Sequence, residues 1–363
     1  MAELPRQRKA SMILICHILE DQFLFFDALS GIIDIDFIIA IPYSLDKRAY
    51  SVLAEKYKIF TPTLTELMNR DFLQELILSN ISPVKEYIIS EIGGYCAPFI
   101  NNLAIAMGGK LLGVIEDTES GHKKYLQQDK IMLPIVSVAR SILKEKEDFL
   151  VGERCLSSFC EMLSRGNHDP VDTFKMCGIF GFGKIGRSIA HALRKRCFHN
   201  VLIYDHNPFQ RLQACVEGFQ IPHKEVMLQK ADYIFGATGN CSLSGEDFYL
   251  IKNGASLVSC SSKDIEYDLK SVFSLYQSEF FAEGIQQFRS NKNSFYLLAE
   301  GRPINFWKHP KLIGPILLLV QAEIILATYK ILSGHFAAGL NTIPNEEKEF
   351  IAHLWLKNVG RLD

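Results

Sequence analysis

The sequence predicts an α/β fold built on doubly wound parallel β-sheets, and two observations carry that prediction. Between residues 176 and 260, short apolar runs alternate with stretches of helical periodicity. A glycine-rich segment, Gly181-Phe-Gly-Lys-Ile-Gly186, follows the first of these runs directly. Strands that alternate with helices at this spacing build a parallel sheet with helices on both faces.

The elements of this region are expected in a regular order along the chain. We expect strands at 176–180, 201–204, 233–237 and 256–260, and helices at 185–194 and 209–217.

The first 150 residues form a second α/β region with its own core. We expect strands at 32–41 and 84–90, helices at 47–58 and 71–78, and a long helix at 142–163. The turn residues Gly166-Asn-His-Asp-Pro170 then interrupt the chain just before the regular region.

The composition describes an ordinary globular chain. With 363 residues, of which 48% are apolar and 22% charged, it is long enough for two domains with full cores. The net charge of -2 gives no broad cationic surface, so we expect no nucleic-acid partner and no binding to acidic membranes.

Two apolar stretches resemble membrane or export segments only superficially. The run at 12–18 is followed by Glu20 and Asp21, and the run at 315–329 contains Gln321 and Glu323. We therefore expect a cytoplasmic protein in which 315–329 is a buried helix. The nine cysteines lack paired metal spacing, which favours reduced, mostly buried thiols and no metal site.

The glycine-rich segment has the spacing and context of a dinucleotide-binding turn. Its first glycine permits the tight turn, its second lets the backbone approach a pyrophosphate, and its third lets helix and strand pack closely. The phosphates would meet the positive end of the helix. The expected contacts come from Gly181, Phe182, Gly183, Lys184, Ile185 and Gly186.

Asp205 ends the second strand of this region, where a carboxylate would accept hydrogen bonds from ribose hydroxyls. Since a 2′-phosphate there would meet like charge, we predict NAD as the cofactor. Two alternatives stay open: nearby Arg211 would suit NADP, and the glycine turn can exist without any dinucleotide.

Further segments match one family in order and spacing. They are Gly113-Val-Ile-Glu-Asp-Thr-Glu-Ser-Gly-His122, the stretch 134–152, Ala237-Thr-Gly-Asn240, Leu297-Leu-Ala-Glu-Gly-Arg-Pro-Ile-Asn305 and His309-Pro310. In these segments the chain resembles adenosylhomocysteinase, the NAD-dependent hydrolase of S-adenosylhomocysteine. The Leu-Leu-Ala-Glu-Gly-Arg segment followed by asparagine is the most specific of them.

The resemblance implies a Rossmann-type NAD domain inserted into an α/β substrate domain. The expected parts are 1–152, the first part of the substrate domain; 153–306, the NAD domain; and 307–363, a helix that returns to the substrate domain. A small-molecule nucleoside is the implied substrate. A homo-oligomer is possible, although the family's C-terminal tail, which reaches a neighbouring subunit's NAD, has no counterpart before Asp363.

The resemblance also implies a mechanism: transient 3′-oxidation of the sugar, elimination of the 5′ thiol, water addition and reduction of the ketone. Lys144 beside Asp148 would act as the base, Asp117 would bind the ribose hydroxyls and His17 would serve the 5′ region. His309 and Asn305 would lie at the edge of the site. Cofactor contacts are further implied for Thr118, Ser120, Thr238, Asn240 and Asn305.

Each of these residues also has a purely structural interpretation. Lys144 and Asp148 have the i, i+4 spacing of a solvated helical ion pair. His17 would then be a core histidine, His309 a turn residue and Asp205 a solvated acid at a strand end. Thr118 and Ser120 would be local helix caps.

Four positions depart from the family where it places reacting groups. Ser262 replaces a histidine, Ile92 an aspartate, Leu19 a threonine and Phe149 an asparagine. Unlike a histidine, a serine side chain does not gain or lose a proton near neutral pH. Three hypotheses therefore stay open: an active thioether hydrolase, an NAD-binding protein without turnover, and an NAD-dependent dehydrogenase with another substrate.

Overall fold

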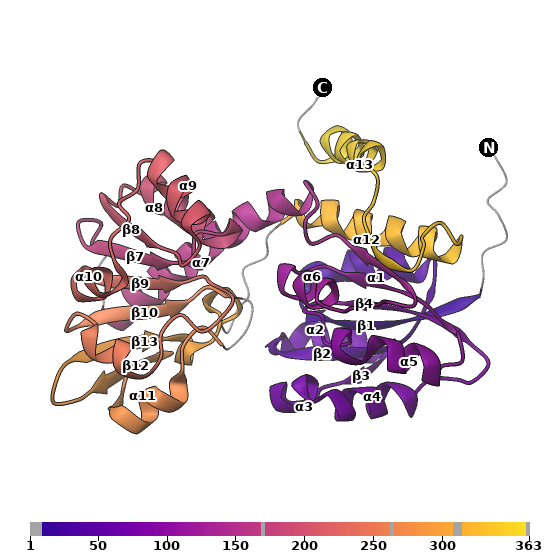
Figure 1. The fold of residues 1–363 in the computed structure, drawn as a ribbon, viewed down its shortest axis with the longest axis horizontal. Helices are drawn as coiled ribbons and strands as arrows, with labels where there is room; N and C mark the ends of the chain where they lie inside the picture. Colours follow the sequence, from indigo (N-terminus) through magenta and orange to yellow (C-terminus); the bar gives the residue numbers. More distant parts are fainter. Residues whose placement is uncertain (1–8, 168–170, 262–264, 308–313, 361–363) are drawn as a thin grey trace. The chain divides into compact units, whose positions relative to one another are not determined.

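The computed structural model describes residues 9–167, 171–261, 265–307 and 314–360. The chain forms two compact units, each with its own sheet (Figure 1). Unit 1 comprises Met1–Glu147 and Leu312–Asp363, and unit 2 comprises Asp148–Lys311. The units thus change at 147/148 and 311/312, where the sequence analysis places the borders at 152/153 and 306/307.

Unit 1 contains a seven-stranded sheet in the order β14-β6-β5-β4-β1-β2-β3. Every strand pair in it is parallel. The strands are β1 (Ala10–Ile18), β2 (Asp34–Leu45), β3 (Lys58–Phe60), β4 (Glu86–Glu91), β5 (Leu111–Glu116), β6 (Pro134–Ser137) and β14 (Gly339–Asn341).

Helices cover both faces of this sheet, because alternate residues of its central strands are buried on opposite sides. Met12 and Leu14 of β1 join one core, whereas Ile13 and Ile15 join the other. The first core includes α1 (Phe23–Ser30), α2 (Lys47–Ala54) and α12 (Leu317–Leu332); the second includes α3 (Leu64–Met68), α4 (Arg70–Leu78), α5 (Ile100–Ala106) and α6 (Glu119–Leu126).

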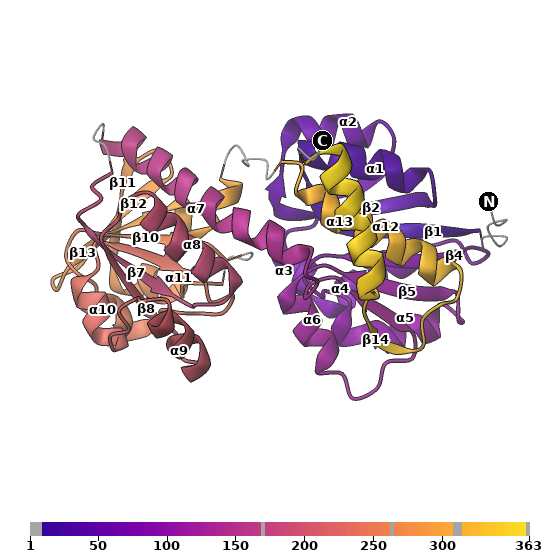
Figure 2. The same cartoon turned by 90° about the horizontal axis from the view of Figure 1, so that it is seen from above.

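The segment predicted as a buried helix at 315–329 is α12, and it packs on β5 and α1 of unit 1. Helix α13 (Asn345–Asn358) lies against α12, as Figures 1 and 2 both show in yellow. The C-terminal part of the chain therefore completes the unit that the N-terminal part begins.

Unit 2 has a seven-stranded sheet in the order β11-β12-β13-β10-β9-β7-β8. The five strands β8, β7, β9, β10 and β13 are parallel, and β12 and β11 continue the sheet in antiparallel pairs. Their bounds are β7 (Met176–Phe180), β8 (Asn200–Tyr204), β9 (Tyr233–Gly236), β10 (Ala255–Ser259), β11 (Gln277–Ala282), β12 (Ile285–Arg289) and β13 (Ser294–Leu298).

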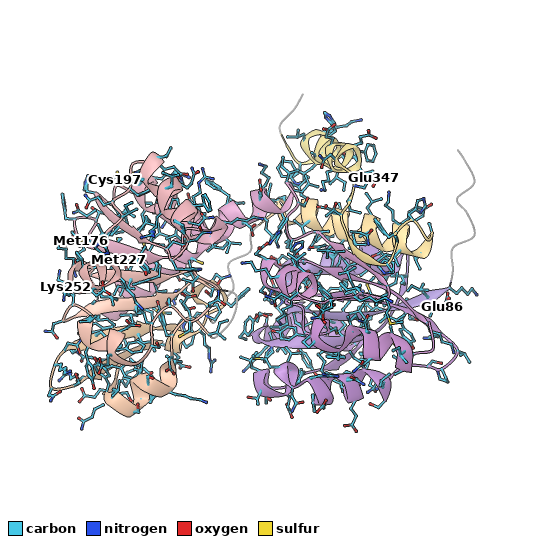
Figure 3. All side chains as sticks on the ribbon, viewed as in Figure 1. Glu86, Met176, Cys197, Met227, Lys252 and Glu347 are labelled. Atoms are coloured by element: carbon cyan, nitrogen blue, oxygen red, sulfur yellow. The ribbon has the colours of Figure 1, made fainter. Side chains whose placement is uncertain are left out.

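The helices of unit 2 also cover two faces. Helix α7 (Lys144–Asn167), which enters from unit 1, packs with α8 (Lys184–Lys195) and α9 (Pro208–Val216) on one core. Helices α10 (Lys224–Lys230) and α11 (Leu269–Leu275) belong to the other. Met227 of α10, labelled in Figure 3, fills the space over Gly178 of β7, where a Cβ atom would lie 3.0 Å from Met227 Cγ.

The elements predicted in unit 2 are confirmed to within a residue or two. One prediction in unit 1 is wrong: the helix expected at 47–58 ends at Ala54, and β3 begins at Lys58. Lys58 to Phe60 pair with Phe37 to Ile39 of β2. Pairing with a buried strand outweighs the local helical periodicity there.

Within the described ranges, none of the helices is long and apolar enough to span a bilayer. All nine cysteines lie in those ranges as free thiols.

Candidate functional site

The topology of each unit marks one edge where a ligand is expected. In unit 1, β1 pairs with β2 on one side and with β4 on the other, so the winding reverses between β1 and β4. In unit 2 the winding reverses between β7 and β9. Open parallel sheets bind ligands beyond the carboxyl ends of the strands at such a reversal. Most of the predicted site residues lie at or after the carboxyl ends of these strands or of other strands in the same sheets.

The glycine turn between β7 and α8 has the form that the sequence predicts. Gly181 has φ of +90°, and a Cβ on it would lie 2.6 Å from the carbonyl oxygen of Ala237. A Cβ on Gly186 would lie 1.9 Å from the carbonyl oxygen of Gly181. Neither position has room for a side chain.

Gly183 differs from the other two glycines. It is the N-cap of α8 without a side-chain hydrogen bond, and a Cβ there would meet nothing within 4 Å. Backbone N–H groups at an uncapped helix start can bind phosphate oxygens. The residues present therefore fit a dinucleotide whose pyrophosphate approaches this turn. Ile185 is partly buried in the first turn of α8 and packs on the core.

Asp205 at the end of β8 is tied to the same turn. Its carboxylate is 8% exposed and accepts hydrogen bonds from Phe182 N at 2.7 Å and from Asn207 N at 2.8 Å. A carboxylate has about four lone-pair positions, so acceptor capacity remains for ribose hydroxyls. Asp205 thus positions the glycine turn as well as offering a negative charge, a role that the sequence analysis did not include.

Thr238 and Asn240 follow β9 on the other side of the reversal. The hydroxyl of Thr238 donates to Glu266 Oε1 at 2.9 Å and accepts from Asn240 N at 3.1 Å. Glu266 is fully buried and also accepts from Gly239 N at 3.2 Å and from the Ser261 hydroxyl. Burial raises the pKa of Glu266, which these hydrogen bonds oppose.

Lys184 and Asn305, two further residues predicted to contact the cofactor, also lie in unit 2. Lys184 begins α8 and lies 3.2 Å from Asp148 of α7. Asn305 is partly buried in a short 3₁₀ helix, Ile304–Phe306. The residues predicted near the cofactor therefore belong to one unit, apart from Thr118 and Ser120.

Lys144 is the centre of a charged cluster in unit 1. Its side chain is 12% exposed, and Nζ lies 3.1 Å from Asp117 Oδ1 and 2.8 Å from Glu147 Oε1. The sequence analysis expected Asp148 to orient this lysine. Instead, the helical partner is Glu147, three residues along α7, whereas Asp148 pairs with Lys184 in unit 2. A spacing of three and one of four both bring side chains together on a helix, so sequence alone does not choose between them.

His17 lies at the carboxyl end of β1, partly buried, with Nδ1 hydrogen-bonded to the Ser44 hydroxyl. Burial, reinforced by the positive charge of Lys144, lowers the pKa of His17 to about 3. The imidazole is therefore neutral near physiological pH and can exchange hydrogen bonds without carrying charge.

A buried glutamate that the sequence analysis missed organises the loops at this edge. Glu116 ends β5, is fully buried, and accepts hydrogen bonds from Gly93 N at 3.1 Å, Gly94 N at 2.8 Å and Thr118 N at 2.7 Å. Burial, with the nearby charge of Glu91, raises its pKa to about 8. A Cβ on Gly121 would lie 2.1 Å from its carboxyl carbon, so a glycine makes room for this carboxylate.

Thr118 and Ser120 have structural contacts of their own. The Thr118 hydroxyl caps α6 by accepting from Gly121 N at 3.1 Å, donates to Glu116 at 2.6 Å and lies 3.2 Å from the Ser120 hydroxyl. The capping interpretation of Thr118 is confirmed. Contact of either residue with a cofactor stays a prediction.

The departures from the family have clear structural consequences where they are described. Glu91, beside Ile92, is buried and accepts hydrogen bonds from Cys96 N at 2.9 Å and from the Tyr125 hydroxyl. It is therefore held inward and does not replace the missing aspartate. Leu19 is buried, and Phe149 is half exposed. His309 and Ser262 lie outside the described residues.

Among the residues described here, no group of three or more His, Cys, Asp or Glu side chains has an arrangement suited to a metal ion.

Residues 154–308, less than half of the chain, match the model of the S-adenosyl-L-homocysteine hydrolase NAD binding domain. Two solved structures are similar in overall outline. A glyoxylate reductase from Paecilomyes thermophila has a TM-score of 0.47 and 14% identity, covering 93% of this chain and 99% of its own. A phosphoglycerate oxidoreductase from Vibrio Cholerae o395 has a TM-score of 0.40 and 17% identity, covering 73% of this chain and 80% of its own.

The turn geometry and the domain match lead to the same conclusion. The glycine positions, the uncapped start of α8 and Asp205 have the form of a dinucleotide site, and the matched domain is one that binds NAD. Unit 2 is a Rossmann-type NAD-binding domain.

Proposed function

We propose that this protein oxidises a sugar hydroxyl of a nucleoside with NAD, and that Lys144 is the base that takes up the hydroxyl proton. The observation that carries the proposal is the Lys144 cluster: a mostly buried lysine held between two carboxylates that follow parallel strands of the unit 1 sheet. An amine in such a place is suited to proton transfer. NAD supplies the hydride acceptor for this chemistry when it is bound.

The contacts of Lys144 suggest how substrate would prepare it. Asp117 and Glu147 balance the ammonium charge in the free protein. Sugar hydroxyls that hydrogen-bond to Asp117 would draw that carboxylate away, and the ammonium would then release its proton more readily. Neutral His17 would donate or accept a hydrogen bond near the same edge without adding charge.

Two candidate functions differ in how far the reaction proceeds. In the first, the protein completes a thioether hydrolysis of S-adenosylhomocysteine or a related 5′-thionucleoside; the match to the NAD domain of that hydrolase supports it. In the second, it is a dehydrogenase that stops after oxidation. Glu91 favours the second, because its inward hydrogen bonds leave the elimination step without the carboxylate expected at Ile92.

One experiment separates these candidates. The NAD-loaded protein is mixed with adenosine or S-adenosylhomocysteine while NADH absorbance and free thiol are followed. Thiol release with only transient NADH supports the hydrolase, whereas stoichiometric NADH without thiol supports the dehydrogenase. If NADH never forms with any nucleoside offered, both candidates fail and a binding protein without turnover remains.

The matched controls lie on one helix. Lys144→Ala removes the proposed base, and Lys146→Ala removes an exposed lysine two residues away. Loss of NADH formation in the first variant but not in the second would support the assignment. Equal rates in both would contradict it.

A further inference from the structure

The pairing of β1 with β2 is interrupted opposite the histidine near the end of β1. The last regular pair before the interruption joins Cys16 to Ala40, and pairing resumes between Ile18 and Leu45. His17 therefore lies opposite a bulge in β2. A bulge changes the direction of the side chains around it, and bulges are common next to active sites.

The bulge consists of residues 41–44, and the chain directly after it is fixed by two hydrogen bonds. The backbone N–H of Asp46 donates to the Ile18 carbonyl at 2.8 Å, and the Asp46 side chain caps α2 by accepting from Ala49 N at 2.8 Å. Pro42 suits the bulge, because a proline has no N–H for a strand ladder. The sheet and α2 together therefore determine where the bulge residues lie.

Ser44 is the last residue of the bulge and is 1% exposed. Its hydroxyl group is hydrogen-bonded to Nδ1 of His17 and donates to the carbonyl oxygen of Ile41 at 3.3 Å. A hydroxyl has only one proton to donate, and a carbonyl oxygen can only accept. An imidazole nitrogen can do either. Both hydrogen bonds form together when Ser44 donates to Ile41 and accepts from a proton on His17 Nδ1.

This arrangement determines what the other ring nitrogen of His17 can do. Burial lowers the pKa of His17 to about 3, so the ring has a single proton near neutral pH. With that proton on Nδ1, Nε2 has a lone pair and acts as an acceptor. A ligand group that contacts Nε2 must then donate a hydrogen bond, as a hydroxyl or N–H does and an ether or thioether does not.

We propose that Ser44 is a positioning residue that holds His17 in the Nδ1–H tautomer, so that Nε2 accepts a hydrogen bond from a hydroxyl or N–H group of the substrate. His17 lies at the carboxyl end of β1, which borders the reversal of the unit 1 sheet. The tautomer is a property of the free protein. Only the contact with a nucleoside substrate rests on the proposed function.

The direct test is nitrogen-15 NMR of the histidine rings in the full chain near neutral pH. The His17 ring signals are assigned by through-bond correlation to its backbone, in wild type, Ser44→Ala and Ser51→Ala. Ser51 is an exposed control on α2, whose hydroxyl donates to the Lys47 carbonyl at 3.0 Å.

We expect the wild-type ring proton of His17 on Nδ1. The ratio of the Nδ1–H to the Nε2–H tautomer should fall by about 10-fold in Ser44→Ala, which is the effect of losing one hydrogen bond, and should not change in Ser51→Ala. A wild-type ring with its proton on Nε2, or with both nitrogens protonated, would overturn the proposal even if Ser44→Ala fails to fold. An unchanged ratio in folded Ser44→Ala, or an equal change in Ser51→Ala, would also overturn it.

Turnover measurements separate this proposal from the proposed function. In Ser44→Ala, kcat/KM for NADH formation from a nucleoside should fall by about 10-fold, because the acceptor form of His17 is less populated. The expected tautomer without NADH formation from any nucleoside would support the role of Ser44 and contradict the proposed function. NADH formation by a protein with the His17 proton on Nε2 would do the opposite.

Discussion

The two units support the loops at the carboxyl edge of their sheets in the same way. Each has a buried glutamate beneath its reversal edge, Glu116 in unit 1 and Glu266 in unit 2, and each glutamate accepts backbone N–H groups from the loop of a neighbouring strand. Each also depends on a nearby glycine: a Cβ on Gly121 or Gly236 would lie within 2.4 Å of the glutamate side chain.

Beyond this shared support, the two edges differ in charge. The unit 2 edge presents a glycine turn with open space at Gly183 and a helix start without a side-chain cap, which suit an anionic dinucleotide. The unit 1 edge presents Lys144 between two carboxylates, which suits hydroxyl groups and proton transfer. In both units the winding of the sheet marks the edge where a ligand is expected, and the residues after each strand determine the charge of that edge.

The largest effect is expected at the charged edge of unit 1. Lys144→Ala should lower the rate of NADH formation by about 10²–10⁴-fold, because one proton-transfer group is lost. NAD affinity, measured by titration, should stay within about twofold, since the cofactor site is in unit 2. A similar loss of NAD affinity and of rate would break the proposed division between the units.

The next effect tests the glycine turn of unit 2. Gly186→Ala should cost roughly 1–3 kcal/mol of unfolding free energy and weaken NAD at least about 10-fold, because its Cβ would strike the Gly181 carbonyl 1.9 Å away. Gly183→Ala is the control for packing: it has open space and should keep its stability in thermal melts while losing NAD affinity. Unchanged NAD binding in both variants would contradict the placement of the cofactor.

The buried glutamate of unit 1 gives a pH-dependent prediction. Burial raises the pKa of Glu116 from 4.5 to about 8, so the folded protein binds more protons than the unfolded chain between these values. Its contribution to stability is therefore complete below about pH 4.5 and is lost as the pH rises through about 8. Urea unfolding of wild type should show this decline, and Glu116→Gln should show a flatter profile. Parallel profiles would argue against the raised pKa.

The smallest effect is expected for Lys184→Met. Its ion pair with Asp148 is more than one third exposed on the lysine side, so its loss should change stability by less than about 1 kcal/mol. NAD affinity should fall only a few-fold, because backbone N–H groups supply most of the phosphate contacts. Thermal melts and NAD titration measure both, with Lys184→Arg as the charge-preserving control. A loss of NAD affinity as large as that of Gly186→Ala would indicate that the Lys184 side chain, and not the backbone, supplies the main phosphate contact.

Local sequence signals predicted the elements whose residues act close to their own position in the chain. The strand at 176–180, the glycine turn and the start of α8 follow from apolar runs and glycine spacing. The buried helix α12 was likewise predictable from its composition.

Features that depend on distant residues were not predictable in this way. Glu116 and Glu266 look like ordinary acids at a strand end and in a loop, and only the folded chain brings them under backbone N–H groups of other loops. The ion pairs of Lys144 were not predictable for the same reason: Asp117 follows another strand, and sequence spacing alone does not choose between Glu147 and Asp148. The sequence did single out Glu323, because it is a charged residue within an apolar helix. The sequence did not show which residues surround it.

The most direct test of the central claim is hydrogen exchange of the full chain during titration with NAD and with NADP. The account predicts that NAD slows exchange of the amides at 182–186. It also predicts that NADP binds at least about 10-fold more weakly in the same titration, because its 2′-phosphate meets the Asp205 carboxylate. Unchanged exchange at these amides under saturating NAD, or equal protection by both dinucleotides, would contradict it.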